Sequence, residues 1–197
     1  MPISRRSALR LLAGGGAFVV LAGSAACGAQ AAGTGKPPVA TLLPGQPGYF
    51  GGTDLAWVEI TIAMDEQLLP LLALSKGRAA NASVLAFSDA VREFTEQELT
   101  ALRALHDQAK LPSTNPHEGM LMPGMVTPEQ VTAAQAASGK AFDALLVQGV
   151  RAHLTQGTSL AGSEVKAGVE PRTLALAKQV LSTRAKAQAQ IKVLPLA

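Results

Sequence analysis

The sequence predicts an all-α domain, an up-and-down bundle of four long helices with one short helix between its halves. Composition is the first reason, because only 4% of the 197 residues are aromatic while Ala and Leu are abundant, which favours helix over sheet. Helical periodicity in four long segments is the second reason. The third is a repeat between the two halves, which indicates a duplicated helical hairpin.

The first half contains two predicted helices. Residues 53–75 place apolar side chains on one stripe, namely Trp57, Ile60, Met64, Leu68 and Leu71. Pro70 lies inside this run and predicts a kink or an early end, because proline cannot donate the helical hydrogen bond. After a turn at 77–83, the second helix is expected over 81–109, with a candidate core of Leu85, Val91, Phe94, Leu99, Leu102 and Leu105.

The second half follows a long loop at residues 111–125. Thr127 begins a capping-box pattern that is followed by proline at the first helical position, which predicts the start of a short helix. That helix is expected to stop near Ser138-Gly139. Residues 140–166 and 171–193 supply two further long helices, and Pro171 again marks a start.

A constant offset of 89 residues relates the two halves without a gap. It pairs identical residues along both predicted hairpins, among them Asp54 with Asp143, Val58 with Val147, Gln67 with Gln156, and Val91 with Val180. The same offset pairs Met64 with His153, and these two side chains are expected to face each other across the core.

Residues 1–26 are predicted to be a signal peptide. A basic start, MPISRRSALR, precedes an apolar run that is too short and glycine-rich for a membrane-spanning helix of roughly 20 residues. Arg5 and Arg6 with their neighbours resemble a twin-arginine export signal. An ordinary Sec signal with two adjacent arginines is the alternative.

The only cysteine, Cys27, follows small residues in a pattern that resembles a bacterial lipobox, although Ser24 stands where leucine is usual. A plain signal peptide would instead leave a lone thiol in an oxidising compartment. Residues 27–52 are rich in Gly and Pro and predict a flexible tether to a domain at 53–197. The sequence thus predicts an exported protein, attached to the membrane by a lipid anchor at the outer face of the cytoplasmic membrane or in a periplasm-like space.

The charge of the mature chain excludes a nucleic-acid footprint. The chain has 17 basic and 14 acidic residues, and three of the basic ones belong to the signal peptide. The remaining charges balance, whereas a nucleic-acid-binding surface needs a basic surplus.

The stretch NPHEGMLMPGMVTPEQ concentrates sulfur in one loop. His117, Met120, Met122 and Met125 could together bind Cu(I), because thioether and imidazole are ligands that this soft ion prefers. Alternatively, the methionines fill gaps at one end of the bundle, or they form a docking surface for an envelope protein.

The segments GMLMPGMVTPEQ, ASGKAFDALLVQGVRAHLTQG and AGVEPRTLALAKQVLSTRAKAQAQI resemble domain-of-unknown-function family 305. The resemblance runs from Asp54 to the C-terminus and implies a ferritin-like helical bundle of the bacterial envelope, with some members associated with copper handling. It also implies a metal site built from a His-His pair in each half, followed by Gln or Glu and then Met.

This chain departs from that pattern at most of the implied ligands. Met64-Asp65 and His153-Leu154 replace the two pairs, and Arg184 stands where glutamine is usual. A cation at that position raises the cost of binding another cation. The residues left for a remnant metal site are His153 and Met64, with Asp65, Glu66 and Glu98 as further candidates.

No pattern supports an enzyme. None of the three histidines belongs to a Glu-x-x-His motif, and neither a zinc ligand set nor a catalytic triad appears. We therefore expect a protein without catalytic residues and without a cofactor, acting as a binding or scaffold module. The alternative is an extracytoplasmic copper(I)-binding protein that uses the Met/His loop.

Overall fold

The computed structural model describes residues 41–195, so the predictions for Arg5, Arg6 and Cys27 lie outside the described part of the chain. Within that part all regular structure is helical, which confirms the all-α prediction. The six helices are α1 (Gly52–Ala73), α2 (Ser75–Arg78), α3 (Ala82–Ala109), α4 (Pro128–Ala136), α5 (Gly139–Ala167) and α6 (Pro171–Ile191). None of these helices is long and apolar enough to span a membrane.

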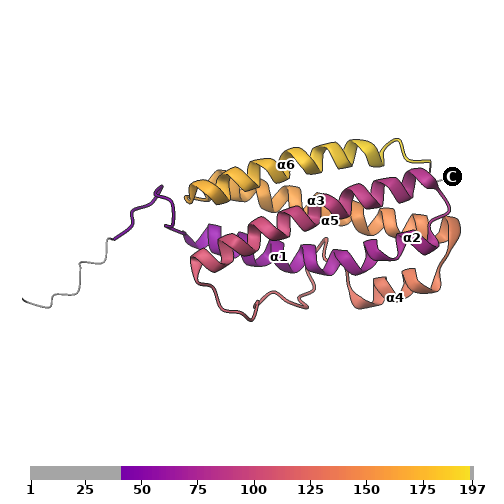
Figure 1. Ribbon diagram of the computed structural model, residues 1–197, viewed down its shortest axis with the longest axis horizontal. Coiled ribbons are helices and arrows are strands. Elements are labelled where there is room, and N and C mark those ends of the chain that lie inside the picture. Colours follow the sequence, from indigo (N-terminus) through magenta and orange to yellow (C-terminus); the bar gives the residue numbers. More distant parts are fainter. Residues whose placement is uncertain (1–40, 196–197) are drawn as a thin grey trace, which may run out of the picture. The chain divides into compact units, whose positions relative to one another are not determined.

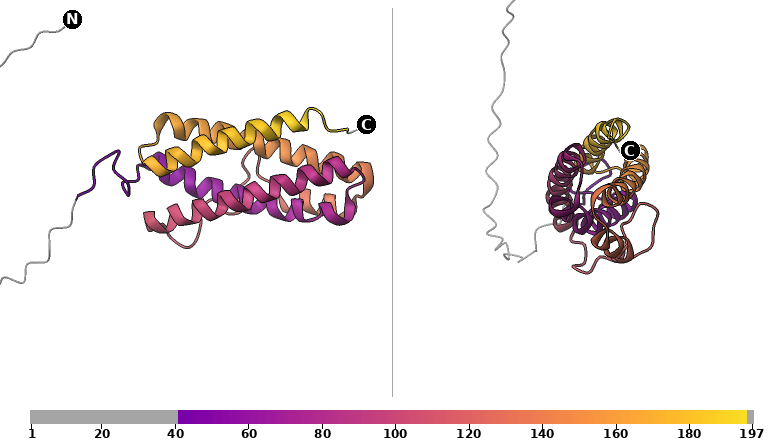
Figure 2. Two further views of the ribbon diagram at one scale, coloured as in Figure 1. Left: turned by 45° about the horizontal axis from the view of Figure 1, so that its top comes forward. Right: turned by 90° about the vertical axis from the view of Figure 1, so that its right-hand side faces the viewer.

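The four long helices pack around a common axis (Figures 1 and 2). Helix α1 contacts α3 and α5, and α6 contacts the same two helices, so each hairpin packs on the other. The short helix α4 lies outside this ring against α1 and α5. The loop between α3 and α4 therefore runs along the outside of the bundle.

Helix starts follow the sequence signals closely. Asn81 caps α3 by accepting a hydrogen bond from the Ser83 amide, and Thr127 closes a capping box with Gln130 ahead of α4. Proline occupies the first position of both α4 and α6, as predicted. These local interactions explain why the starts could be read from sequence.

Pro70 neither ends nor interrupts α1, contrary to one outcome expected from the sequence. The helix continues to Ala73, and the Pro70 ring lies on its exposed face. The hydrogen bond that Pro70 cannot donate is the one to the Glu66 carbonyl in the preceding turn. Only one turn follows Pro70, and burial of Leu71 and Leu72 holds that turn in place.

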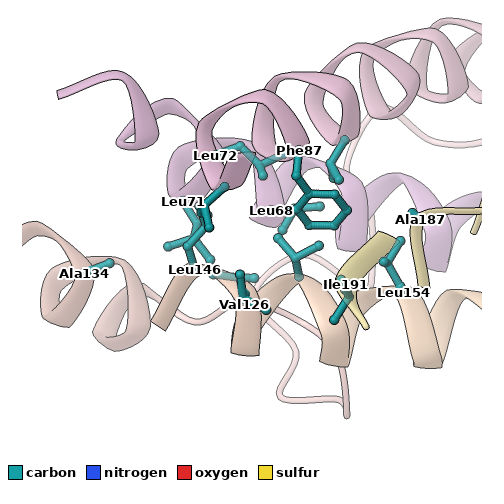
Figure 3. Close-up of a cluster of buried hydrophobic side chains, with 14 of the residues drawn as sticks. Leu68, Leu71, Leu72, Phe87, Val126, Ala134, Leu146, Leu154, Ala187 and Ile191 are labelled. Atoms are coloured by element: carbon teal, nitrogen blue, oxygen red, sulfur yellow. The ribbon is translucent and has the colours of Figure 1, made fainter. Parts of the chain in front are cut away.

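One half of the core is a cluster of leucine, valine and phenylalanine from all four long helices (Figure 3). Its side chains include Leu68, Phe87, Leu146, Leu154 and Ile191. A second cluster around Trp57, Leu102 and Val180 fills the other half. Most of the predicted core is buried, but Ile60, Leu85 and Phe94 are only half-buried. At the start of α3 the buried residue is Val84, one position before Leu85.

The duplication is visible in the helix boundaries and at both ends of the bundle. Helix α3 begins at Ala82 and α6 at Pro171, 89 residues later. The Asp143 carboxylate accepts hydrogen bonds from the Ala80 and Asn81 amides at 3.2 and 3.1 Å, and Asp54 accepts from the equivalent amides ahead of α6 at 3.0 and 3.1 Å.

The last residues of the predicted tether belong structurally to the bundle. The Gly48 amide donates to the Glu170 carboxylate at 3.1 Å, and Phe50 packs against the second core cluster. Gly48 and Phe50 therefore contact the bundle, although the sequence prediction placed them in the tether. Its Gly/Pro composition concealed this, because the contacts are long-range.

Candidate functional site

A fully buried arginine occupies the centre of the bundle. Arg184, on α6, donates from Nη1 to both oxygens of Glu98 on α3, at 2.8 and 2.6 Å. Its Nη2 lies 3.3 Å from an oxygen of Asp65 on α1. A guanidinium presents its N–H groups in a planar fork, so one arginine can neutralise two carboxylates on different helices.

His153 on α5 completes this central network. Its Nε2 lies 3.2 Å from Asp65 Oδ1 and 3.4 Å from Arg184 Nη2. Burial lowers the pKa of His153, which keeps the ring neutral; with its proton on Nε2, the ring donates to Asp65. Residues from all four long helices thus converge on one point.

Burial also acts on Glu98. It raises the pKa of this carboxyl to about 7, and nearby Asp65 adds to the rise, whereas Arg184 opposes it. The network is not saturated, because Asp65 Oδ2, His153 Nδ1 and Arg184 Nε are buried without a hydrogen-bond partner. Hydrogen bonds therefore satisfy the buried polar atoms of the network only in part.

Gly157 makes room for the arginine. A Cβ atom at this position would stand 2.3 Å from Arg184 Nε. The residue 89 positions earlier is Leu68, whose side chain fills the corresponding space in the first hairpin, where Arg184 is matched by Thr95. A Gly–Arg pair in one half thus replaces a Leu–Thr pair in the other.

The structure distributes the six sequence-predicted metal ligands over three places. His153 belongs to the central network. Met64 and Met125 are buried together in a small cluster, with Met122 packed against it. His117 and Met120 form a pair near the surface, with 3.2 Å between Nδ1 and Sδ and with Met120 43% exposed.

The loop that carries these residues is attached firmly to α1 and α5. Asn115 donates to the Glu59 carbonyl at 2.8 Å. The Gln67 amide, oriented to satisfy both partners, accepts from Gly119 and donates to Val126. Gly124 has φ +81° and would place a Cβ 2.8 Å from the Ala152 carbonyl oxygen, so only glycine fits there.

Between this loop, α1 and α4 lies an apolar groove of about 510 Å³. We name it the α4 groove and define it by Gln67, Pro70, Met120, Val126 and Val131. Leu121, at the same edge, is 83% exposed. A groove of this size and character is suited to an apolar ligand.

Two features escaped sequence reasoning. The ion pairs of Arg184 were missed, although the sequence identified the arginine as an obstacle to metal binding. Glu164, a fully buried carboxyl near Asp54, was missed as well. The offset of 89 gave no signal for it, because the equivalent residue is Ser75 and the burial of both positions appears only in the structure.

Among residues 41–195, no three or more His, Cys, Asp or Glu side chains are arranged to hold a metal ion. The central positions do not fit one either, because the Arg184 guanidinium already lies among the oxygens and the imidazole that would be ligands.

Comparison with known proteins agrees with this fold. Two solved structures are similar: a DUF305 fragment from Deinococcus radiodurans, with TM-score 0.65 and 14% identity over 75% of this chain and 96% of that one, and a DUF305 protein described as secreted from Streptomyces coelicolor, with TM-score 0.64 and 16% identity over 71% and 89%. No curated protein matches the chain. The model of the family described as "Domain of unknown function (DUF305)" matches residues 54–194, so the chain belongs to this family.

Proposed function

We propose that this protein is a non-catalytic binding module of the cell envelope, exported and held at the outer face of the membrane by a lipid on Cys27. The observation that carries the proposal is Arg184. Its positive charge lies among the positions to which the family resemblance assigns metal ligands. Arg184 pairs there with Glu98 and Asp65, where a metal ion would otherwise bind. The central network then stabilises the fold, and we expect binding to take place at the surface of the bundle.

The α4 groove is the proposed binding surface. Its lining is mostly apolar, and Glu118 is the only charged residue there. We therefore expect an uncharged, apolar peptide segment of another envelope protein as its occupant. Attachment of the loop through Gln67 keeps the groove open, so little ordering entropy is lost on binding.

Selection from a library of short displayed peptides tests this proposal. Enriched peptides should be apolar, and Val131→Asp in the groove should abolish their binding. The matched control is Leu43→Asp, which changes an exposed apolar residue outside the groove and should leave binding unchanged. Peptides that bind Val131→Asp as well as they bind the unaltered protein would contradict the proposal.

Copper(I) binding by the loop is a second candidate, favoured by the 3.2 Å approach of His117 Nδ1 to Met120 Sδ. A neutral imidazole nitrogen and a thioether suit this ion. The buried Met64 and Met125, together with the partly buried Met122, offer a competing set of sulfurs.

Titration of the purified protein with Cu(I) against a competing chelator separates these options. A surface site predicts loss of binding with Met120→Leu and retention with Met122→Leu, whereas an interior site predicts the reverse. Absence of binding in the unaltered protein would remove copper from consideration.

A further inference from the structure

Asp54 fastens one end of the bundle. Its carboxylate accepts hydrogen bonds from the amides of Gly51, Val169 and Glu170 at 2.7, 3.0 and 3.1 Å, and from the Thr173 hydroxyl at 2.7 Å. Burial favours its neutral form, but these bonds outweigh burial and lower the pKa of Asp54. Asp54 is therefore a carboxylate that accepts from all its neighbours.

Glu170 is a second carboxylate at the same end. It caps α6 by accepting from the Arg172 and Thr173 amides, and it also accepts from the Arg172 side chain at 2.7 Å and the Gly48 amide at 3.1 Å. Although burial opposes ionisation, these bonds lower the pKa of Glu170. Arg172, whose side chain also reaches Gln108 on α3, is directed at Glu170, whereas Lys166 and Lys110 at the same end are exposed.

Glu164 is the third carboxyl and has no such partners. Both of its oxygens are buried without a hydrogen bond from a nitrogen or hydroxyl donor. It faces Asp54 and Thr173, but the Thr173 hydroxyl is shared between Asp54 and the Glu170 carbonyl. The charges acting on Glu164 are those of Asp54 and Glu170, both negative.

These contacts leave one stable arrangement. A neutral Glu164 can donate its proton to Asp54, whereas an ionised Glu164 would bury a third negative charge without a donor. Burial, followed by the proximity of the Asp54 carboxylate, raises the pKa of Glu164 to about 7. A metal ion is a poorer substitute for the proton, because the Asp54 oxygens already accept from four donors.

We propose that Glu164, Asp54 and Glu170 form a proton-controlled latch on residues 48–51, the segment that joins the domain to its N-terminal tether. With Glu164 protonated, the carboxylic acid bonds to Asp54 and the Gly48 and Gly51 amides stay bound. When Glu164 loses its proton, repulsion among the three carboxylates weakens those bonds and frees the segment. The latch goes beyond peptide or copper binding, because it sets how the domain connects to its tether.

The opposite end of the bundle supplies a built-in control. Asp143 accepts from the Ala80 and Asn81 amides as Asp54 accepts from their equivalents. The position equivalent to Glu164 is Ser75, whose hydroxyl donates to the Leu72 carbonyl at 2.8 Å. That end therefore lacks a carboxyl equivalent to Glu164, and its amides should keep their protection between the two pH values.

Amide hydrogen exchange of the full chain at pH 5.5 and pH 8.5, corrected for the intrinsic rate, tests the latch. We expect protection of the Gly48, Gly51 and Val169 amides to fall by at least about tenfold at the higher pH, the equivalent of one pKa unit. The Ala80 and Asn81 amides should keep their protection. An equal loss at both ends, or no loss at either, would overturn the proposal.

Two further measurements test whether Glu164 is the group that controls the latch. Glu164→Gln, which stays neutral, should hold Gly48 and Gly51 protected at both pH values; persistence of the pH response in this variant would refute the latch. In the unaltered protein, the Glu164 carboxyl carbon should titrate near neutral pH by NMR, and titration in the range of an exposed glutamate would refute it equally.

Discussion

The two helical hairpins share one backbone plan but differ where charges are buried. In the first hairpin, the positions equivalent to Arg184, Gly157 and Glu164 hold Thr95, Leu68 and Ser75. The Thr95 hydroxyl donates to a carbonyl of its own helix, and the Ser75 hydroxyl donates to the Leu72 carbonyl near the end of α1. In the second hairpin the same positions hold a guanidinium, the space for it, and an unpartnered carboxyl. The duplication therefore preserved the frame and let the two halves take different electrostatic roles.

At the centre, each polar member of the network has a mate of a different kind. Asp65 is matched by Leu154, Glu98 by Ala187, and His153 by Met64. If the residues of the second half occupied both halves, the centre would bury two arginines next to each other, and their desolvation would cost much free energy. The observed network, with one arginine, avoids that cost. Each of its four members differs from its equivalent residue, so each difference can be tested by substitution.

The largest expected effect comes from breaking the centre. Arg184→Met should lower the free energy of unfolding by about 3–5 kcal/mol, because Glu98 and Asp65 remain buried without their cation. Urea denaturation measures the loss. Adding Asp65→Leu and Glu98→Ala, which copy the equivalent residues, should recover most of it. Arg151→Met on the exposed face of α5 is the control and should cost less than about 0.5 kcal/mol.

The next effect is a pH dependence carried by Glu164. Its folded pKa of about 7 lies above the ordinary value of 4.5, so the folded state holds more protons than the unfolded state between these values. Stability from this group is therefore complete below pH 4.5 and is lost as pH rises through about 7, by up to about 3 kcal/mol. Glu98, raised in the same direction, adds to the loss.

Urea denaturation of the unaltered protein and Glu164→Gln at pH 5 and pH 8 isolates the contribution of Glu164. The variant should lose clearly less stability between the two pH values, with the remainder assigned to Glu98. An equal loss in both proteins would show that Glu164 is already ionised in the folded state at pH 5.

Gly157→Ala should destabilise the protein by about 2 kcal/mol, because its Cβ would overlap Arg184 and force the guanidinium from its partners. Gly162→Ala, five residues later in the same helix, meets no atom within 4 Å and should stabilise by about 0.5 kcal/mol. Thermal unfolding measures the change in melting temperature of each variant. Changes of opposite sign would support close packing around Arg184, and changes of the same sign would argue against it.

A smaller effect than that of Gly157→Ala distinguishes the two ends of the bundle. Asp54→Asn removes charge from a group that accepts four hydrogen bonds, and Asp143→Asn from one that accepts two. We expect the first to cost about 1 kcal/mol more than the second. Thermal unfolding at pH 5.5 compares them, and equal costs would show that the extra donors add little.

Local signals made the fold predictable. Thr127, Pro128 and Pro171 fix helix starts through contacts within one turn, so each start could be read without knowledge of the partner helices. The offset of 89 added the pairing of the hairpins, since a gapless repeat leaves equivalent positions in equivalent places. The effect of Pro70 was misjudged in part because it depends on how much helix follows and on the burial of Leu71 and Leu72, which is a tertiary contact.

The sequence by itself determined the four long helices, their duplication, the short helix α4 and the presence of a cation where a metal ligand was expected, but it did not indicate α2. Only the tertiary structure decided that Arg184 meets Glu98, Asp65 and His153, and that Glu164 lies beside Asp54 without a donor. The physical reason is range. A helix cap acts between neighbours in the chain, whereas desolvation and ion pairing depend on which groups share a buried space after residues distant in the sequence have packed together.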